Sequence, residues 1–128
     1  MVFWRNSKAT RASALSHHQL SADHLAIIRQ ILAPFASQIE LAGLFGSRAT
    51  GRARPNSDID LVLYGPLDEA AAARIWTLFD DSNLPMTVDV VAYNHITHDG
   101  LKAHIDRVML PLFSHAELQE SALSRQAN

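Results

Sequence analysis

Residues 58–64 read Asp-Ile-Asp-Leu-Val-Leu-Tyr, and this short run constrains the fold more than any other part of the chain. Its alternation predicts a β-strand with two faces. One face carries Ile59, Leu61 and Leu63, and the other carries Asp58, Asp60 and Val62. Two carboxylates on the same face of a strand repel each other, and each raises the pKa of the other. The pattern therefore indicates that a divalent cation balances this pair of charges.

Apolar periodicity and turn signals divide the rest of the chain into alternating helices and strands. Helical spacing predicts three helices, over 21–38, 68–81 and from 97–99 to the proline at 111, with a further helical turn or two within 48–54. Apolar runs predict strands over 39–45 and 86–93, beside the one at 58–64. This order predicts an α/β (α+β) fold in which helices pack on a small mixed sheet.

The length and composition of the chain suit one folded domain. It has 128 residues, of which 48% are hydrophobic and 19% charged. A chain of this size buries roughly two-thirds of its unfolded surface, which supports one core. We expect the domain to span 21–114, after a flexible N-terminal leader over 1–20 and before a C-terminal tail over 115–128. The leader is basic and contains several Ser and Ala residues, so an organellar transit peptide is the alternative for it.

Three bulk properties exclude several classes of function. The formal net charge of −2 argues against a protein that coats nucleic acid or an anionic membrane. Without cysteine, the chain can form no disulfide, thiolate zinc site or cysteine nucleophile. No apolar run approaches the roughly 20 residues that span a bilayer. We therefore expect a cytoplasmic protein that contacts neither a membrane nor nucleic acid directly.

A third aspartate stands in the last predicted strand. Asp89 lies within a run of valines, where a charge is costly unless it has a partner. If this strand pairs beside 58–64, Asp89 converges with Asp58 and Asp60. Magnesium binds through one or two carboxylates and completes its shell with water and phosphate. Three carboxylates also suit two metal ions about 3.5–4 Å apart, which stabilise the attacking and leaving oxygens of an in-line displacement.

Gly46 and Ser47 follow the first predicted strand and supply features that bind phosphate. A glycine at the end of a strand lets the backbone approach an anion closely, and the turn after it presents N–H groups. The Ser47 hydroxyl can donate to a phosphoryl oxygen, and Arg48 stands where a guanidinium could clamp a phosphate. Each feature alone is common in proteins, whereas the joint pattern with the three aspartates is rarely produced by chance.

The segments 44–51 and 57–62 read Leu-Phe-Gly-Ser-Arg-Ala-Thr-Gly and Ser-Asp-Ile-Asp-Leu-Val. Together they resemble the Gly-Ser-x10-Asp-x-Asp signature of the DNA polymerase beta-type nucleotidyltransferase superfamily, and more closely its minimal nucleotidyltransferases. The resemblance covers about residues 22–113, and no position of the motif is missing.

This resemblance implies roles for six residues. It assigns catalysis and metal binding to the three carboxylates of Asp58, Asp60 and Asp89. It assigns nucleotide binding to Gly46, Ser47 and Arg48. The metal would be Mg²⁺, with Mn²⁺ as the alternative, and the nucleotide substrate would be ATP.

The resemblance also implies a partner. Minimal nucleotidyltransferases are typically encoded beside an all-helical HEPN-type protein, often a toxin ribonuclease, and act as its antitoxin; some transfer AMP from ATP to a tyrosine of that toxin. We therefore expect a magnesium-dependent nucleotidyltransferase that modifies a protein side chain, in a homodimer or hetero-oligomer. The alternative is a binding module that neutralises a helical partner by contact. Transfer to a small molecule such as an aminoglycoside is disfavoured, because enzymes of that kind carry an additional substrate-binding domain.

The remaining features carry weaker expectations. His17 and His18 lie in the leader and are interpreted as surface residues. Three further histidines form a loose cluster near the start of the last helix, where metal binding is the less favoured interpretation: His95, His98 and His104. Trp76 lies beside the apolar stripe of its helix and is expected in the core or at an interface. An exposed apolar surface over 108–113 is expected to pack against a partner chain.

Overall fold

The computed structural model describes residues 18–127, and its centre is a four-stranded mixed sheet. The strands, in chain order, are β1 (Leu41–Phe45), β2 (Ile59–Tyr64), β3 (Val88–Ala92) and β4 (Leu110–Ser114). Their order across the sheet is β3-β2-β1-β4. β1 runs antiparallel to β2 and β4, whereas β2 and β3 run parallel. The predicted small mixed sheet is therefore confirmed.

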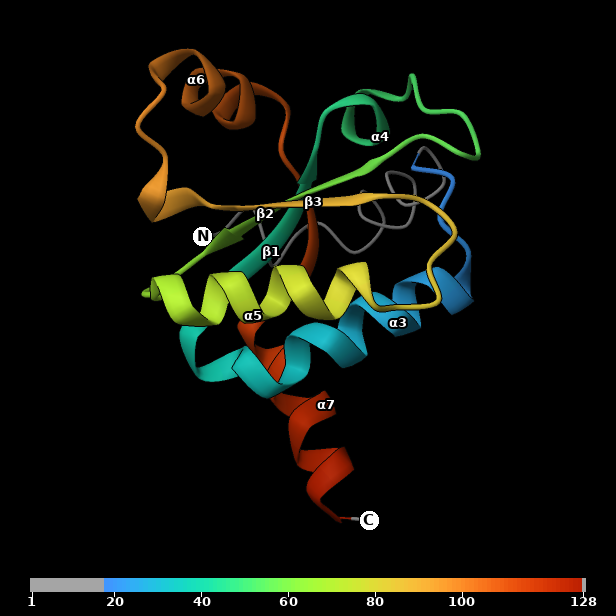
Figure 1. The fold of residues 1–128 in the computed structure, drawn as a ribbon, viewed down its shortest axis with the longest axis vertical. Coiled ribbons are helices and arrows are strands. Elements are labelled where there is room, and N and C mark those ends of the chain that lie inside the picture. The colour runs from blue at the N-terminus through green and yellow to red at the C-terminus, as the bar shows by residue number, and fades with distance from the viewer. Residues whose placement is uncertain (1–17, 128) are drawn as a thin grey trace.

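Helices cover both faces of this sheet (Figure 1). One face is covered by α3 (Ala22–Leu32), which continues as the short 3-10 helix η1 (Ala33–Gln38), and by α5 (Glu69–Asp80) and α7 (His115–Ala127). The other face carries α4 (Ser47–Thr50) and α6 (Asp99–Val108), and a 3-10 turn η2 (Tyr93–His95) precedes α6. Ser21 caps α3 by accepting from the His24 N–H, and Asp68 caps α5 by accepting from the Ala71 N–H.

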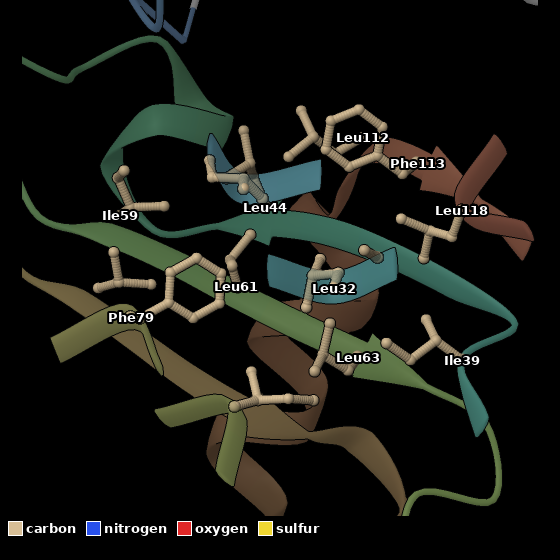
Figure 2. Close-up of a cluster of buried hydrophobic side chains, with 14 of the residues drawn as sticks. Leu32, Ile39, Leu44, Ile59, Leu61, Leu63, Phe79, Leu112, Phe113 and Leu118 are labelled. Atoms are coloured by element: carbon tan, nitrogen blue, oxygen red, sulfur yellow. The ribbon is translucent and has the colours of Figure 1, made fainter. Parts of the chain in front are cut away.

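The alternation of β2 separates two hydrophobic clusters. The larger cluster lies between the sheet and the helices α3 and α5. Three β2 side chains are fully buried in it and are drawn in Figure 2: Ile59, Leu61 and Leu63. Val62 faces the opposite way and packs with Phe45 and with Ile105 of α6. Asp60 shares the face of Val62, because alternate residues of a strand point to the same side. Asp60, the carboxylate of β2, therefore lies on the side of the sheet that α6 covers.

The chain after α6 differs from the expectation. α6 ends at Val108, and the next residues form β4 rather than an exposed apolar surface. Leu112 and Phe113 are buried in the core, so the expected exposure of these two residues is wrong, while packing of the half-buried residues 108–111 against a partner stays a prediction. The strand contains Pro111, which an edge strand tolerates because one row of its N–H groups has no partner in the sheet.

The residues expected as a C-terminal tail form a packed helix. Leu118 of α7 is fully buried in the larger cluster, and Arg29 of α3 forms an ion pair with Glu117 at 3.6 Å. α7 therefore belongs to the folded domain. By contrast, Trp76 is 51% exposed on α5, which favours an interface over the core for this side chain.

The start of the described range is also packed. His18 and Leu20 are both buried, and Leu20 belongs to the larger cluster. The interpretation of His18 as a surface residue is therefore wrong, while the rest of the expected leader, including His17, lies outside the described residues. Over 18–127, none of the helices combines the length and the apolar content that a membrane crossing requires.

Candidate active site

The parallel pairing of β2 and β3 places two of the three predicted carboxylates side by side. Asp60 and Asp89 are direct partners in the register of these strands, and Asp58 immediately precedes β2. Asp60 is half-buried, whereas Asp58 and Asp89 are exposed. Asp89 is exposed on the edge strand β3, so its charge does not carry the burial cost that its valine neighbours suggested.

Among the residues that the structure describes, no positively charged group is in contact with these carboxylates. Within residues 18–127, none of the three forms an ion pair or a hydrogen bond with another side chain or with the backbone. Burial raises the pKa of Asp60, and the neighbouring charges of Asp89 and then Asp58 raise it further; His104 and Arg48 oppose this. Such uncompensated negative charge fits a divalent cation bound by these oxygens.

In the described structure, the three carboxylates do not form a complete metal-binding site. The described part of the chain contains no group of three His, Asp or Glu side chains that could already hold a metal ion. A cation at this end of the sheet would therefore have to draw the carboxylates of Asp58, Asp60 and Asp89 together. Water and phosphate oxygens would complete its coordination, as magnesium prefers.

The turn between β1 and α4 lies directly against Asp60. Gly46 has φ +71°, a backbone conformation that favours glycine, and a β-carbon on it would overlap the Asp60 Oδ2 atom. Ser47 and Arg48 begin α4, and their N–H groups have no acceptor within the helix. The Ser47 hydroxyl makes no hydrogen bond among the described residues. The turn therefore offers donors beside the carboxylates.

Arg48 occupies a different position from the one expected. It is 0% exposed, and its guanidinium donates to three backbone carbonyls: Nη1 to His18 at 2.6 Å, Nη2 to Pro55 at 3.1 Å, and both Nη2 and Nε to Ser57 at 2.6 and 3.2 Å. Four of the five guanidinium N–H groups can thus be assigned to the backbone. Arg48 has no exposed surface with which to clamp a phosphate, and it holds the loop before Asp58 instead.

The structure adds His104 to the neighbourhood of the carboxylates. Phe45 is the register partner of Asp60, and the His104 ring stands edge-on to Phe45 with 6.4 Å between centroids. His104 also lowers the pKa of Asp60. The sequence contained a signal for this position, because residue 104 lies one turn from Leu101 and Val108 on the stripe of α6 that faces the sheet.

The other two histidines of the predicted cluster lie elsewhere. His98 caps α6 by accepting from the Leu101 N–H at 3.0 Å, and His95 is exposed in η2. The loose sequence cluster is therefore not a site of its own, and only His104 comes near the carboxylates.

Comparison with known proteins agrees with this geometry. Residues 27–118 match the family model of polymerase beta, nucleotidyltransferase. The probable protein adenylyltransferase MntA of Haemophilus influenzae is 33% identical over 82 residues, which cover 62% of this chain and 71% of MntA.

Solved structures show the same fold. A toxin–antitoxin complex crystallised with AMP-PNP contains a chain that is 22% identical, with a TM-score of 0.58 over 81% of this chain and 87% of that one. A chain in a mutant MntA-HpeT toxin–antitoxin complex is 20% identical, with a TM-score of 0.56 over 84% and 87% of the two chains. The family model spans well over half of the chain, and the range it matches contains the three carboxylates and the Gly46 turn. The chain therefore belongs to the polymerase beta-type nucleotidyltransferase family, as a homologue of MntA.

Proposed function

We propose that this nucleotidyltransferase transfers AMP from ATP to a side chain of a partner protein in a magnesium-dependent reaction. The partner would be an all-helical HEPN-type toxin in the cytoplasm, so that the transfer makes this chain its antitoxin. The observation that carries the proposal is the adjacency of Asp60 and Asp89 beside the Gly46 turn. The names of the relatives support it: MntA is a probable protein adenylyltransferase, and the matched structures are toxin–antitoxin complexes, one of them with AMP-PNP.

In this proposal Asp58, Asp60 and Asp89 hold Mg²⁺, or Mn²⁺ in its place. The bound cation would neutralise the triphosphate and stabilise the charge that develops on the attacking and leaving oxygens. The lack of ion pairs between the three carboxylates and any other residue of the described range supports this role, because their charge is otherwise uncompensated there.

The chain's other groups would position the nucleotide. The Gly46 turn brings backbone N–H groups toward the triphosphate, and the Ser47 hydroxyl donates to a phosphoryl oxygen. An oxygen of the acceptor side chain then bonds to the α-phosphorus. The bond from the α-phosphorus to the bridging oxygen of the β-phosphate breaks, pyrophosphate leaves with the bonding electrons, and the acceptor's proton passes to solvent. Positioning and charge neutralisation supply most of the catalysis in such transfers.

One observation favours a second function. Trp76 is 51% exposed on α5, on the face of the sheet opposite α6, and a large exposed aromatic residue is typical of a protein interface. A binding module that neutralises its helical partner by contact alone would use such a surface and would not need the carboxylates.

An assay with the protein encoded beside this one distinguishes the two functions. The partner is incubated with this chain, Mg²⁺ and ATP labelled at the α-phosphate, and its activity is followed in parallel. Catalysis predicts a labelled partner and loss of both label and neutralisation with Asp58→Asn combined with Asp60→Asn. If the double variant still neutralises the partner although the partner carries no label, the chain acts as a binding module. Trp76→Ala is the matched variant, which should impair partner binding and leave nucleotide binding intact.

A further inference from the structure

Arg48 is the only charged residue among the fully buried side chains of the described range, and no carboxylate pairs with it. Its charge is satisfied by carbonyl dipoles instead, through the four hydrogen bonds to His18, Pro55 and Ser57. Burying a guanidinium is costly, and the cost is offset only if its donors are well paired. The four hydrogen bonds to backbone carbonyls supply this pairing for Arg48.

The bonds of Arg48 converge on the residue next to a proposed metal ligand. The Ser57 carbonyl accepts two of them, and Ser57 directly precedes Asp58. The same turn is closed by two further bonds, from the Ser57 N–H to the Arg54 carbonyl at 3.0 Å and from the Arg54 N–H to Ser57 Oγ at 2.8 Å. The direction in which the chain enters β2 at Asp58 is thus fixed by the guanidinium.

Arg48 also connects the two halves of the candidate site. Its backbone belongs to α4, which begins at the Gly46 turn, while its side chain holds the turn before Asp58. Because both Nη2 and Nε reach the loop, the planar fork of the guanidinium sets the orientation of α4 against the loop as well as its distance.

A segment outside the catalytic elements completes this arrangement. The His18 carbonyl accepts from Arg48 Nη1, and Gln19 Nε2 donates to the Ala53 carbonyl at 2.8 Å in the same loop. Gln19 has φ +58°, a conformation that is uncommon for a residue other than glycine and that costs about 1 kcal/mol or more. Two hydrogen bonds thus hold residues 18–19 against the loop over 48–57, and the surrounding contacts maintain the unfavourable φ of Gln19.

We infer that Arg48 is a positioning residue, which fixes Asp58 for metal binding through the Ser57 carbonyl, and that residues 18–19 anchor this loop from outside the family's catalytic elements. The inference rests on the proposed metal-dependent function for its consequence in catalysis, whereas the bracing of the loop is independent of it. Residues 18–19, which were expected in the N-terminal leader, would then help to position the candidate site.

The test compares Arg48→Lys and Gln19→Ala with the wild type and with Arg74→Lys, a change at an exposed arginine of α5. Lysine keeps the charge but cannot hold three carbonyls with a planar fork. Three quantities are measured: hydrogen exchange of the peptide over 52–60, Mn²⁺ binding by electron paramagnetic resonance, and kcat and KM for ATP. The first two need no acceptor protein.

For Arg48→Lys we expect exchange over 52–60 to accelerate by about tenfold or more. Mn²⁺ binding should weaken severalfold, and kcat should fall by about 10- to 100-fold because Asp58 is misplaced. KM for ATP should stay within about twofold, since the Gly46 turn is intact. Gln19→Ala should show the same changes in smaller degree, and Arg74→Lys should match the wild type.

Two results would overturn the inference. Unchanged exchange and Mn²⁺ binding in folded Arg48→Lys and Gln19→Ala proteins would show that the loop needs no brace. A rise in KM for ATP with unchanged kcat would show that Arg48 contacts the nucleotide directly. If the wild type binds Mn²⁺ but transfers no nucleotide, the proposed function fails, and the exchange and binding comparisons still decide the role of Arg48.

Discussion

The backbone of Gly46 lies against the carboxylate of Asp60, so closely that a β-carbon at position 46 would overlap Asp60 Oδ2. Gly46 lies in the turn after β1 and Asp60 lies in β2, so the two residues belong to the two halves of the site, the phosphate-binding turn and the carboxylates. This contact requires a glycine at position 46 for two reasons. A side chain would collide with Asp60, and the φ of +71° is unfavourable for other residues. Any ligand that binds the turn is thereby brought to the carboxylates.

Gly46→Ala should therefore remove activity by displacing Asp60. We expect kcat to fall by about 100-fold or more, because the added methyl group pushes the carboxylate away from its position. The matched control is Gly51→Ala, where φ is +79° and the residue is exposed at the end of α4. Both variants should lose about 1 kcal/mol of stability from backbone strain. Equal kcat values for the two variants would refute a specific contact between Gly46 and Asp60.

Asp60→Asn should stabilise the metal-free protein while abolishing transfer. The pKa of Asp60 is raised by burial and by the charges of Asp89 and Asp58, so the ionised group costs stability at neutral pH. This cost is relieved as the pH falls through the folded-state pKa. We expect Tm of the variant to exceed that of the wild type by a few degrees at pH 7.5, and by less at acidic pH.

The same Tm measurement is repeated with Mg²⁺ present. Mg²⁺ should raise Tm of the wild type, because a ligand that binds only the folded state stabilises it, and should have little effect on Asp60→Asn. A less stable variant in metal-free buffer would contradict the view that charge at Asp60 is uncompensated.

His18 should make stability depend on pH in the opposite direction. Burial, followed by the nearby charge of Arg48, lowers the pKa of His18 from 6.5 to about 4. The unfolded chain then binds the proton first on acidification, so the contribution of His18 is present above pH 6.5 and is lost as the pH falls toward 4. Proton uptake is also incompatible with the bond that His18 Nδ1 accepts from the Leu20 N–H at 2.9 Å.

His18→Gln removes this titration. The stability advantage of the wild type over the variant should shrink by about 1 kcal/mol between pH 7.5 and 5.5, measured by urea unfolding. A constant difference across this range would show that His18 can be protonated without loss of its packing.

α7 should contribute to the stability of the fold although it follows the candidate site in the chain. Leu118→Ala removes a fully buried side chain and should cost about 2–4 kcal/mol. Leu123→Ala lies on the same helix, is 56% exposed in the wild type, and should cost less than about 1 kcal/mol. Chemical unfolding of both variants measures the difference. Similar small costs would mean that α7 is an appendage.

Much of the fold could be predicted because the local sequence patterns agree with the packing that the tertiary structure requires. The alternation of β2 sorted its residues onto the two faces that the structure has, with Ile59 in one cluster and Val62 in the other. Ser21 and Asp68 marked helix starts through their capping chemistry. β4 was missed because Pro111 favours neither a helix nor a central strand, and its place at the edge depends on pairing with β1.

The roles of buried polar residues could not be predicted in the same way. The sequence places Arg48 one residue after Ser47, where a phosphate clamp is chemically reasonable. Its actual partners are carbonyl groups 7, 9 and 30 residues away, and only the folded loop brings them within reach. His18 was misread for the same reason, because its burial depends on Arg48 and the loop rather than on its own neighbours.

In the proposed function, the Gly46 turn and the three carboxylates together transfer a nucleotidyl group to the partner protein. The most direct test incubates the chain and its partner with Mg²⁺ and with ATP labelled at either the α- or the γ-phosphate. We expect the α-label alone to become attached to the partner, with release of pyrophosphate, and Asp60→Asn to abolish this labelling. Attachment of the γ-label, or α-labelling that survives in Asp60→Asn, would contradict the proposed function.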